Sequence, residues 1–142
     1  DWMSTRVEAP FIIDDSGLFV AALKDFPGVY SAHCYKTLGW QGILKLLEGA
    51  EDRSARFECC AGLMIDGKRH IFTGVTEGSI SEAPRGESGF GFDPVFIPNG
   101  MSMTFAEMDH SIKNRISHRG RAFSALVGHL AEAAHAEKDK DA

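Results

Sequence analysis

The fold is decided by residues 55–76, which read ARFECCAGLMIDGKRHIFTGVT. Two strand-like segments, 55–65 and 68–76, are separated only by Asp66 and Gly67. The Asp-Gly dipeptide favours a type I′ turn, because both central residues of that turn need positive φ angles. We therefore predict a β-hairpin, which is the best-determined local element of the chain.

Two further elements can be predicted upstream of the hairpin. Residues 11–13 (Phe-Ile-Ile) form a short apolar run that stops at the polar residues 14–17, a pattern typical of a buried strand that ends in a loop. Between residues 37 and 48, apolar side chains recur at helical spacing, namely Trp40, Ile43, Leu44 and Leu47. Gly49 follows at a suitable C-terminal position, so we predict an amphipathic helix over 37–48.

Downstream of the hairpin, glycine-rich residues 78–94 predict a loop whose backbone approaches another group closely. Thr104 and Glu107 have the spacing of a capping box, which predicts the start of a short helix. A last helix is expected to open near Ser117, with an apolar face formed by Phe123, Leu126, Val127 and Leu130. We expect the charged tail, 135–142, to fray.

No repeat or linker interrupts the 142 residues, of which 44% are hydrophobic. The order of elements predicts one α/β domain over 1–142, with a mixed, twisted β-sheet and flanking helices. The net charge of −5 argues against a nucleic-acid partner. No apolar run approaches the ~20 residues needed to cross a bilayer, so we expect no membrane contact and a cytoplasmic location.

The three cysteines, Cys34, Cys59 and Cys60, have no metal-ligand spacing. Adjacent residues of a strand point to opposite faces, so Cys59 and Cys60 are unsuited to pairing with each other. We expect all three to be reduced and to fill the core.

The acidic turn at residues 14–17 is the first candidate site. Carboxylate oxygens are the ligands that Mg²⁺ prefers, and strand alternation should direct only one of Asp14 and Asp15 toward a site. The alternative is a purely structural turn in which Asp14 and Ser16 cap the backbone and Asp15 is solvated.

The second candidate is Phe90-Gly91-Phe92-Asp93, which precedes Pro94. An aromatic ring on a glycine-flanked loop can stack on a nucleobase, and a neighbouring carboxylate can accept hydrogen bonds from the base or ribose. The alternative is the entry to a strand in which both phenylalanines are core residues.

The third candidate combines Lys113 with His118 and Arg119, in the first turn of the last helix. Cations there oppose the helix macrodipole by ~0.3–1 kcal/mol, and a ligand with acceptor atoms would explain them. The alternative is that these side chains simply extend into water.

Taken in order, six short motifs resemble those of the inosine/xanthosine triphosphate pyrophosphatase family. They are Asp14-Asp15-Ser16-Gly17-Leu18, Pro27-Gly28-Val29-Tyr30-Ser31-Ala32, Pro84-Arg85-Gly86, Phe90-Gly91-Phe92-Asp93-Pro94, Thr104-Phe105-Ala106-Glu107, and Lys113-Asn114 with Ser117-His118-Arg119. The resemblance spans residues 10–130, and residues 35–39 are most similar to archaeal members.

This resemblance implies a Mg²⁺-dependent homodimeric enzyme that hydrolyses ITP, dITP or XTP to the monophosphate and pyrophosphate. It implies that Asp15 binds the metal and accepts the proton of the attacking water, with Asp14 as an alternative metal ligand. The substrate-binding residues that it implies are Ser16, Phe90, Gly91, Phe92, Asp93, Lys113, His118 and Arg119.

The sequence departs from the family pattern in two respects. The family opens with a strand, a Ser/Thr-x-Asn-x-x-Lys phosphate loop and a metal-binding Glu, and the sequence contains no such loop. We therefore expect the domain to lack its N-terminal strand, loop and helix. Phe92 stands where the family often has Tyr or Trp, which removes a polar group.

Two other functions remain open at this point. The chain could be a purine-nucleotide-binding module without catalysis, because it retains the base-recognition residues and lacks the phosphate loop. It could instead resemble a Maf-like pyrophosphatase that acts on modified pyrimidine nucleotides, although the base-recognition residues match the purine family.

Overall fold

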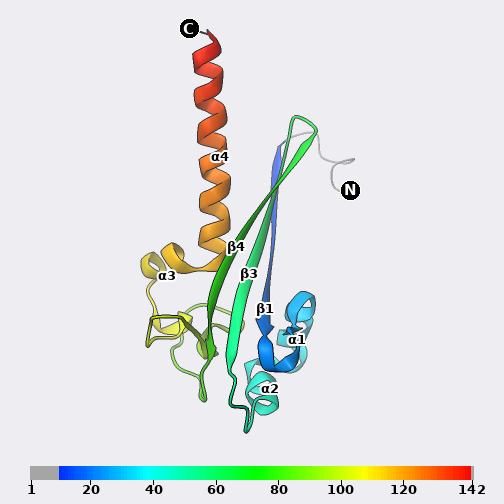
Figure 1. Cartoon of the computed structure of the whole chain (residues 1–142), viewed down its shortest axis with the longest axis vertical. Coiled ribbons are helices and arrows are strands. Elements are labelled where there is room, and N and C mark those ends of the chain that lie inside the picture. Colours follow the sequence, from blue (N-terminus) through cyan, green and yellow to red (C-terminus); the bar gives the residue numbers. More distant parts are fainter. Residues whose placement is uncertain (1–9, 142) are drawn as a thin grey trace.

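A long antiparallel sheet runs through the molecule in the strand order β2-β1-β3-β4-β5 (Figure 1). The computed structural model describes residues 10–141. The strands are β1 (Phe11–Val20), β2 (Phe26–Pro27), β3 (Ser54–Ile65), β4 (Lys68–Ile80) and β5 (Phe96–Pro98). The α/β class with flanking helices is confirmed, but all four strand pairings between described residues are antiparallel rather than mixed in direction.

The predicted hairpin is confirmed as the β3–β4 pair, with Ile65 opposite Lys68. Asp66 and Gly67 have φ angles of 50° and 73°, the positive values that the dipeptide predicts. Cys59 and Cys60 point to opposite faces, as expected. Cys59 is fully buried and Cys60 is exposed, so the expectation that all three cysteines fill the core is wrong for Cys60.

Strand β1 differs from the prediction, because it does not stop at residue 14. It continues to Val20 and pairs with β3 along its whole length, which places Asp14 and Asp15 in the middle of a strand. Ile12 and Ile13 are 46% and 53% exposed, so the expectation of a buried strand is wrong there. Backbone pairing with β3 outweighs the local turn preference of the polar residues.

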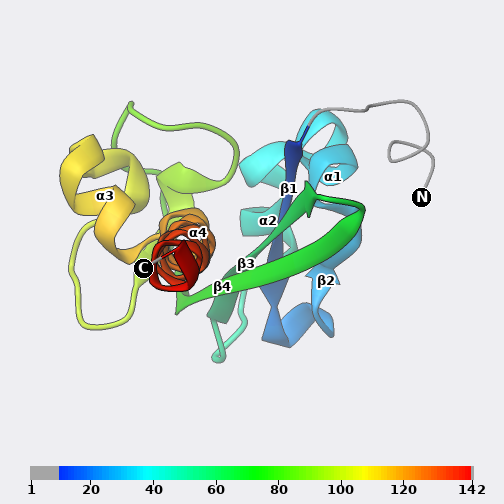
Figure 2. The same ribbon diagram turned by 90° about the horizontal axis from the view of Figure 1, so that it is seen from above.

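Helix α4 (His118–Asp141) covers one face of β3 and β4 (Figure 2). Ala122 and Leu126 are buried against Cys59 and other side chains of the sheet. Val127 is 60% exposed, so the buried stripe is narrower than the predicted apolar face. The tail from residue 135, expected to fray, continues the helix to Asp141. Every side chain of 131–140 is exposed.

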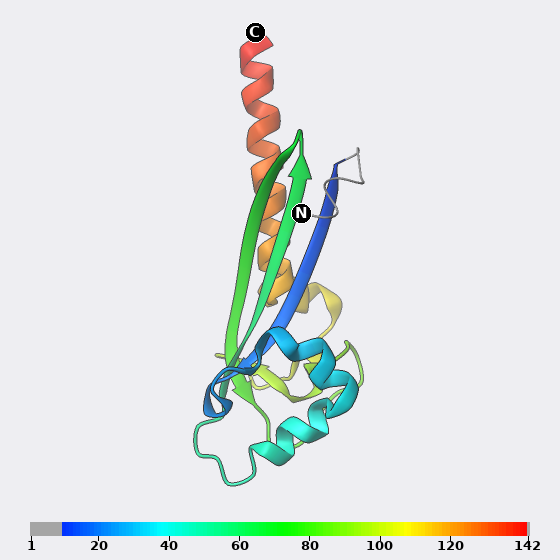
Figure 3. The same cartoon turned by 90° about the vertical axis from the view of Figure 1, so that its right-hand side faces the viewer.

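The main core lies at the end of the sheet opposite the hairpin turn. Helices α1 (Ser31–Thr37) and α2 (Gly39–Leu46) flank this end on the side of β1 (Figure 3). Ile43 and Leu47 are fully buried there, which confirms an amphipathic helix, although α2 begins at Gly39 and ends at Leu46, just before Leu47. Helix α1 was not predicted, because Cys34 is the single buried apolar residue along it.

Short helical turns carry the remaining connections. They are η1 (Ala21–Leu23), η2 (Gly28–Tyr30), η3 (Asp93–Val95) and η4 (Phe105–Glu107), and η4 is followed by α3 (His110–Ile116). The Glu107 carboxylate accepts a hydrogen bond from the Thr104 backbone N–H at 3.0 Å, which confirms the predicted helix start. Within residues 10–141, no helix has the length and apolar character needed to cross a membrane.

Candidate functional site

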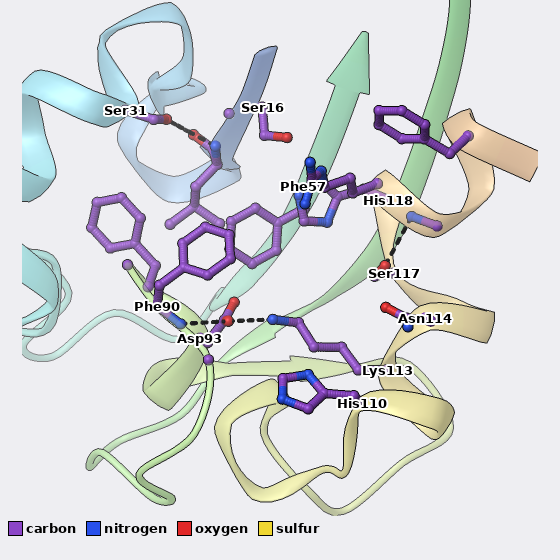
Figure 4. Close-up of a pocket in the computed structure, with 18 of the residues that line it drawn as sticks. Ser16, Ser31, Phe57, Phe90, Asp93, His110, Lys113, Asn114, Ser117 and His118 are labelled. Carbon is purple, nitrogen blue, oxygen red and sulfur yellow. Dashed lines mark hydrogen bonds and ion pairs between the residues drawn. The ribbon is translucent and has the colours of Figure 1, made fainter. Parts of the chain in front are cut away.

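A pocket of about 1120 Å³ opens between two walls of the molecule. One wall is formed by α1 and β1, the other by α3 and the first turns of α4, and the glycine-rich loop lies between them (Figure 4). Eight residues predicted for substrate binding line this pocket together: Ser16, Phe90, Gly91, Phe92, Asp93, Lys113, His118 and Arg119. Residues that are separated by up to about a hundred positions in the sequence therefore meet in one pocket.

The Asp93 side chain holds the glycine-rich loop through hydrogen bonds. Its Oδ2 accepts hydrogen bonds from the Phe90 backbone N–H at 3.0 Å and from the Lys113 ammonium at 2.6 Å (Figure 4). Asp93 is only 4% exposed, so this carboxylate is almost entirely withdrawn from water. A Cβ at Gly89 would collide with Asp93 Oδ2, which explains the need for glycine there.

The two phenylalanines of the loop have different environments. Phe90 is 73% exposed, and the Lys113 ammonium lies 5.0 Å from the centre of its ring. Phe92 is buried and contacts the ring of Tyr35 edge-on, with ring centres 5.7 Å apart. The core interpretation therefore applies to Phe92 alone, whereas Phe90 presents a free aromatic face that suits stacking.

His118 is buried at the start of α4, and its ring stacks on Phe57 at 4.6 Å between centres. Burial, together with the smaller effect of the positive charges of Lys113 and Arg119, lowers the pKa of His118 to about 4. The imidazole is therefore neutral near pH 7. Its Nδ1 is buried and has no hydrogen-bond partner among the described residues.

Arg119 lines the pocket and also links the two walls. Its Nε donates to Asp14 Oδ2 at 3.1 Å, across 105 residues of sequence. The guanidinium carbon lies 5.3 Å from the centre of the Phe123 ring, which packs behind it. This contact joins the middle of β1 to the first turn of α4.

The two acidic residues of β1 are placed differently. Asp14 contacts Arg119, and neither Asp14 nor Asp15 lines the pocket, although the next residue, Ser16, does. Strand alternation directs Asp15 to the opposite face from Asp14, where it is exposed and has no ion-pair partner among residues 10–141. The role of Asp15 as metal ligand and base therefore stays a prediction.

Sequence reasoning did not assign the lining residues of α1, or those of α3 other than Lys113, to the site. They are Ser31, Ala32, Tyr35, Lys36, His110 and Asn114. Ser31 fixes α1 to β1, because its hydroxyl accepts from the Leu18 N–H at 2.8 Å and donates to the Gly28 carbonyl at 2.7 Å. Spacings of three and four residues on these helices could have shown the lining only once the helices themselves were known.

Comparison with known proteins gives consistent matches. A sequence model of the Ham1 family matches residues 2–129. The dITP/XTP pyrophosphatase of the archaeon Thermococcus kodakarensis is 58% identical over 131 residues, which cover 92% of this chain and 71% of that protein. The dITP/XTP pyrophosphatase of Pyrococcus horikoshii is 56% identical over 125 residues, covering 88% and 67%.

Similarity extends to three-dimensional structure. The structure of a HAM1 protein from Coxiella burnetii matches with a TM-score of 0.79 at 43% sequence identity, covering 87% of this chain and 68% of that one. The resemblance found from the six motifs is therefore confirmed, including its similarity to archaeal proteins.

Proposed function

Because the chain belongs to the Ham1 family, we propose that it hydrolyses the non-standard purine nucleoside triphosphates ITP, dITP and XTP. The products are the nucleoside monophosphate and pyrophosphate. The observation that carries this proposal is the pocket itself, in which the exposed Phe90 ring lies beside Lys113 and which His118, with its unpaired Nδ1, also lines. The names of the archaeal relatives support the same reaction.

Base selection follows from hydrogen-bond chemistry. Hypoxanthine and xanthine carry an oxygen acceptor at position 6, where adenine carries an amino donor. Lys113, Arg119 and a neutral His118 with its proton on Nδ1 would all donate to that oxygen. An adenine would leave the buried Nδ1 of His118 unpaired, at a cost of ~1–3 kcal/mol.

Mg²⁺ is the metal that fits the residues present. It is commonly held by one or two carboxylates together with substrate phosphates, and Asp15 offers an exposed carboxylate without an ion-pair partner among the described residues. Within residues 10–141, no three His, Cys, Asp or Glu side chains gather as a ready-made metal site, so the phosphates would supply the other oxygens. When bound, the ion would neutralise phosphate charge and lower the pKa of a water molecule.

The residues of the chain then have separate tasks. Asp15 accepts the proton of the attacking water while the anhydride bond between the α- and β-phosphates breaks, and Ser16 donates a hydrogen bond to the substrate beside it. Phe90 stacks on the purine, and Asp93 holds the loop and Lys113 in place. The chemistry is thus assigned to β1, and base recognition to the glycine-rich loop, α3 and the start of α4.

Pyrophosphate release from ITP, dITP, XTP, ATP, dUTP and dTTP tests this function. We expect the three 6-oxo purine substrates to react far faster than ATP, and preferential reaction of dUTP or dTTP would instead favour a Maf-like enzyme. We expect Asp15→Asn to reduce turnover at least ~100-fold while calorimetric binding of IMP survives. Glu58→Gln, which removes a carboxylate charge outside the pocket lining, is the matched control; equal turnover in Asp15→Asn and wild type would exclude Asp15 as the base.

We also propose that the protein acts as a homodimer in the cytoplasm on small-molecule nucleotides, without a nucleic-acid or membrane partner. Sedimentation measurements test the dimer. IMP binding without any hydrolysis would favour a purine-binding module over the enzyme.

A further inference from the structure

We propose that Asp14 is a positioning residue that holds the Arg119 guanidinium across the pocket, with its Nε occupied and its two terminal nitrogens directed to the purine. This inference rests on the proposed function and assigns a task to the first carboxylate of the Asp-Asp pair. It separates that task from the one proposed for Asp15.

The contacts of Arg119 define which donors remain free. Nε is engaged by Asp14 Oδ2 at 3.1 Å, and the Phe123 ring packs 5.3 Å from the guanidinium carbon. The terminal nitrogens, Nη1 and Nη2, make no hydrogen bond to any residue in the described range 10–141, while Arg119 lines the pocket. Their N–H groups point in fixed directions once Nε is held, because the guanidinium is planar.

Arg119 needs such support because of its position on α4. It lies in the first turn, where the helix macrodipole disfavours a cation, and its side chain is 56% exposed. A long side chain in that setting samples many rotamers, and fixing it for a ligand has an entropic cost. A carboxylate that fixes it beforehand lowers this cost at the moment of binding.

Asp14 is mounted rigidly enough for this task. It stands opposite Ala61 in the middle of a ten-residue strand that pairs throughout with β3. It also shares a strand face with Ser16 and Leu18, both of which line the pocket. The carboxylate therefore reaches the pocket rim from a strand that cannot shift independently of the sheet.

The pairing also distinguishes Asp14 from a metal ligand. A carboxylate engaged with a guanidinium has already met its counter-charge, whereas Asp15 has none among the described residues. The adjacent residues thus face opposite sides of the strand with different partners. Asp14 acts on base binding, and Asp15 on phosphate chemistry.

Calorimetry with IMP in the absence of Mg²⁺, together with ITP kinetics, tests the assignment. We expect Asp14→Ala to weaken IMP binding about tenfold and to raise the KM for ITP similarly, because the long Arg119 side chain must then be ordered on binding. The kcat and the Mg²⁺ concentration for half-maximal activity should stay within twofold. Asp14→Asn should recover most of the affinity, because the amide oxygen still accepts from Nε.

Two controls isolate the pair. Glu58→Ala removes the carboxylate that binds the Nε of Arg56 at 2.9 Å outside the pocket lining, and it should leave IMP binding unchanged. In the Asp14→Ala/Arg119→Ala double variant, IMP affinity should fall no further than in Arg119→Ala alone. Additive losses would overturn the assignment.

The outcomes separate this inference from the proposed function. If the wild type hydrolyses ITP and Asp14→Ala binds IMP as tightly as the wild type does, the positioning role is overturned and the proposed function stands. A shifted Mg²⁺ requirement with normal IMP affinity also overturns it, because that result identifies a metal ligand. A wild-type protein that neither binds IMP nor hydrolyses ITP overturns both proposals.

Discussion

Two ion pairs border the same pocket, and they differ in their exposure to water. The Lys113–Asp93 pair is 2.6 Å long, and its side chains are 14% and 5% exposed. The Arg119–Asp14 pair is 3.1 Å long, and its side chains are 56% and 31% exposed. Removing one partner of a buried pair leaves the other charge buried without a counter-charge, whereas water hydrates the remaining charge of an exposed pair. We therefore expect the buried pair to contribute more to the stability of the loop than the exposed pair, whose proposed task is to orient Arg119 for the base.

The largest effect on stability is expected from Asp93→Ala. This change leaves the Lys113 ammonium without its counter-charge and the Phe90 N–H without its acceptor. Breaking a buried pair in this way costs ~3–5 kcal/mol. Urea unfolding followed by circular dichroism should show a loss of that order in the free energy of unfolding.

The control for this experiment is Glu48→Ala, which breaks the exposed Lys45–Glu48 pair at the C-terminal end of α2. We expect the free energy of unfolding to change by less than ~1 kcal/mol in that variant. An equally small loss in Asp93→Ala would contradict the distinction between the buried and exposed pairs.

The next largest effect is the pH dependence of the free energy of unfolding that the buried His118 causes. Its pKa is about 4 in the folded protein, below the ordinary value of 6.5, so between these values the unfolded chain binds more protons. The stability that the neutral His118 contributes is fully present above about pH 6.5 and is lost as the pH falls toward 4. At ~1.4 kcal/mol per pKa unit, the free energy of unfolding falls by ~3 kcal/mol over this range.

Unfolding free energies of wild type and His118→Phe between pH 7 and 4 test this contribution. Other groups titrate in the same interval, so the relevant quantity is the difference between the two proteins. We expect the pH dependence to be weaker in His118→Phe, because phenylalanine keeps a ring against Phe57 and binds no proton. Parallel curves for the two proteins would show that His118 is protonated normally in the folded state.

How far the sequence predicted this fold depended on the range of the interactions. The hairpin at Asp66-Gly67 and the helix start at Thr104 are governed by neighbouring residues, and both were predicted correctly. The predicted strand ends at residue 13, whereas β1 continues to Val20, because the polar residues 14–17 favour a turn locally. Only its pairing with β3, some 45 residues away, keeps the chain extended, and no local pattern reports that pairing.

The site shows the same limit. Phe90, Asp93, Lys113 and His118 were identified from short motifs, but their convergence and the burial of Asp93 are properties of the folded chain. Lys36 and Tyr35 were missed because α1 has no apolar stripe that marks it as a helix. The partner of Arg119 was equally beyond reach, since a salt bridge between residues 14 and 119 has no sequence signature.

The smallest effect on stability is expected from Asp14→Ala, in which the exposed ion pair is lost. Both groups can be hydrated in the variant, so the free energy of unfolding should fall by less than ~1 kcal/mol, and by less still in 0.5 M salt. Urea unfolding at low and high salt measures this change directly. A loss above ~2 kcal/mol would place Asp14 with Asp93 as a structural group, and weaker IMP binding in the variant would then reflect a disturbed fold. A small loss combined with weaker binding separates the two pairs, because Asp14 would then change affinity while the fold stays intact.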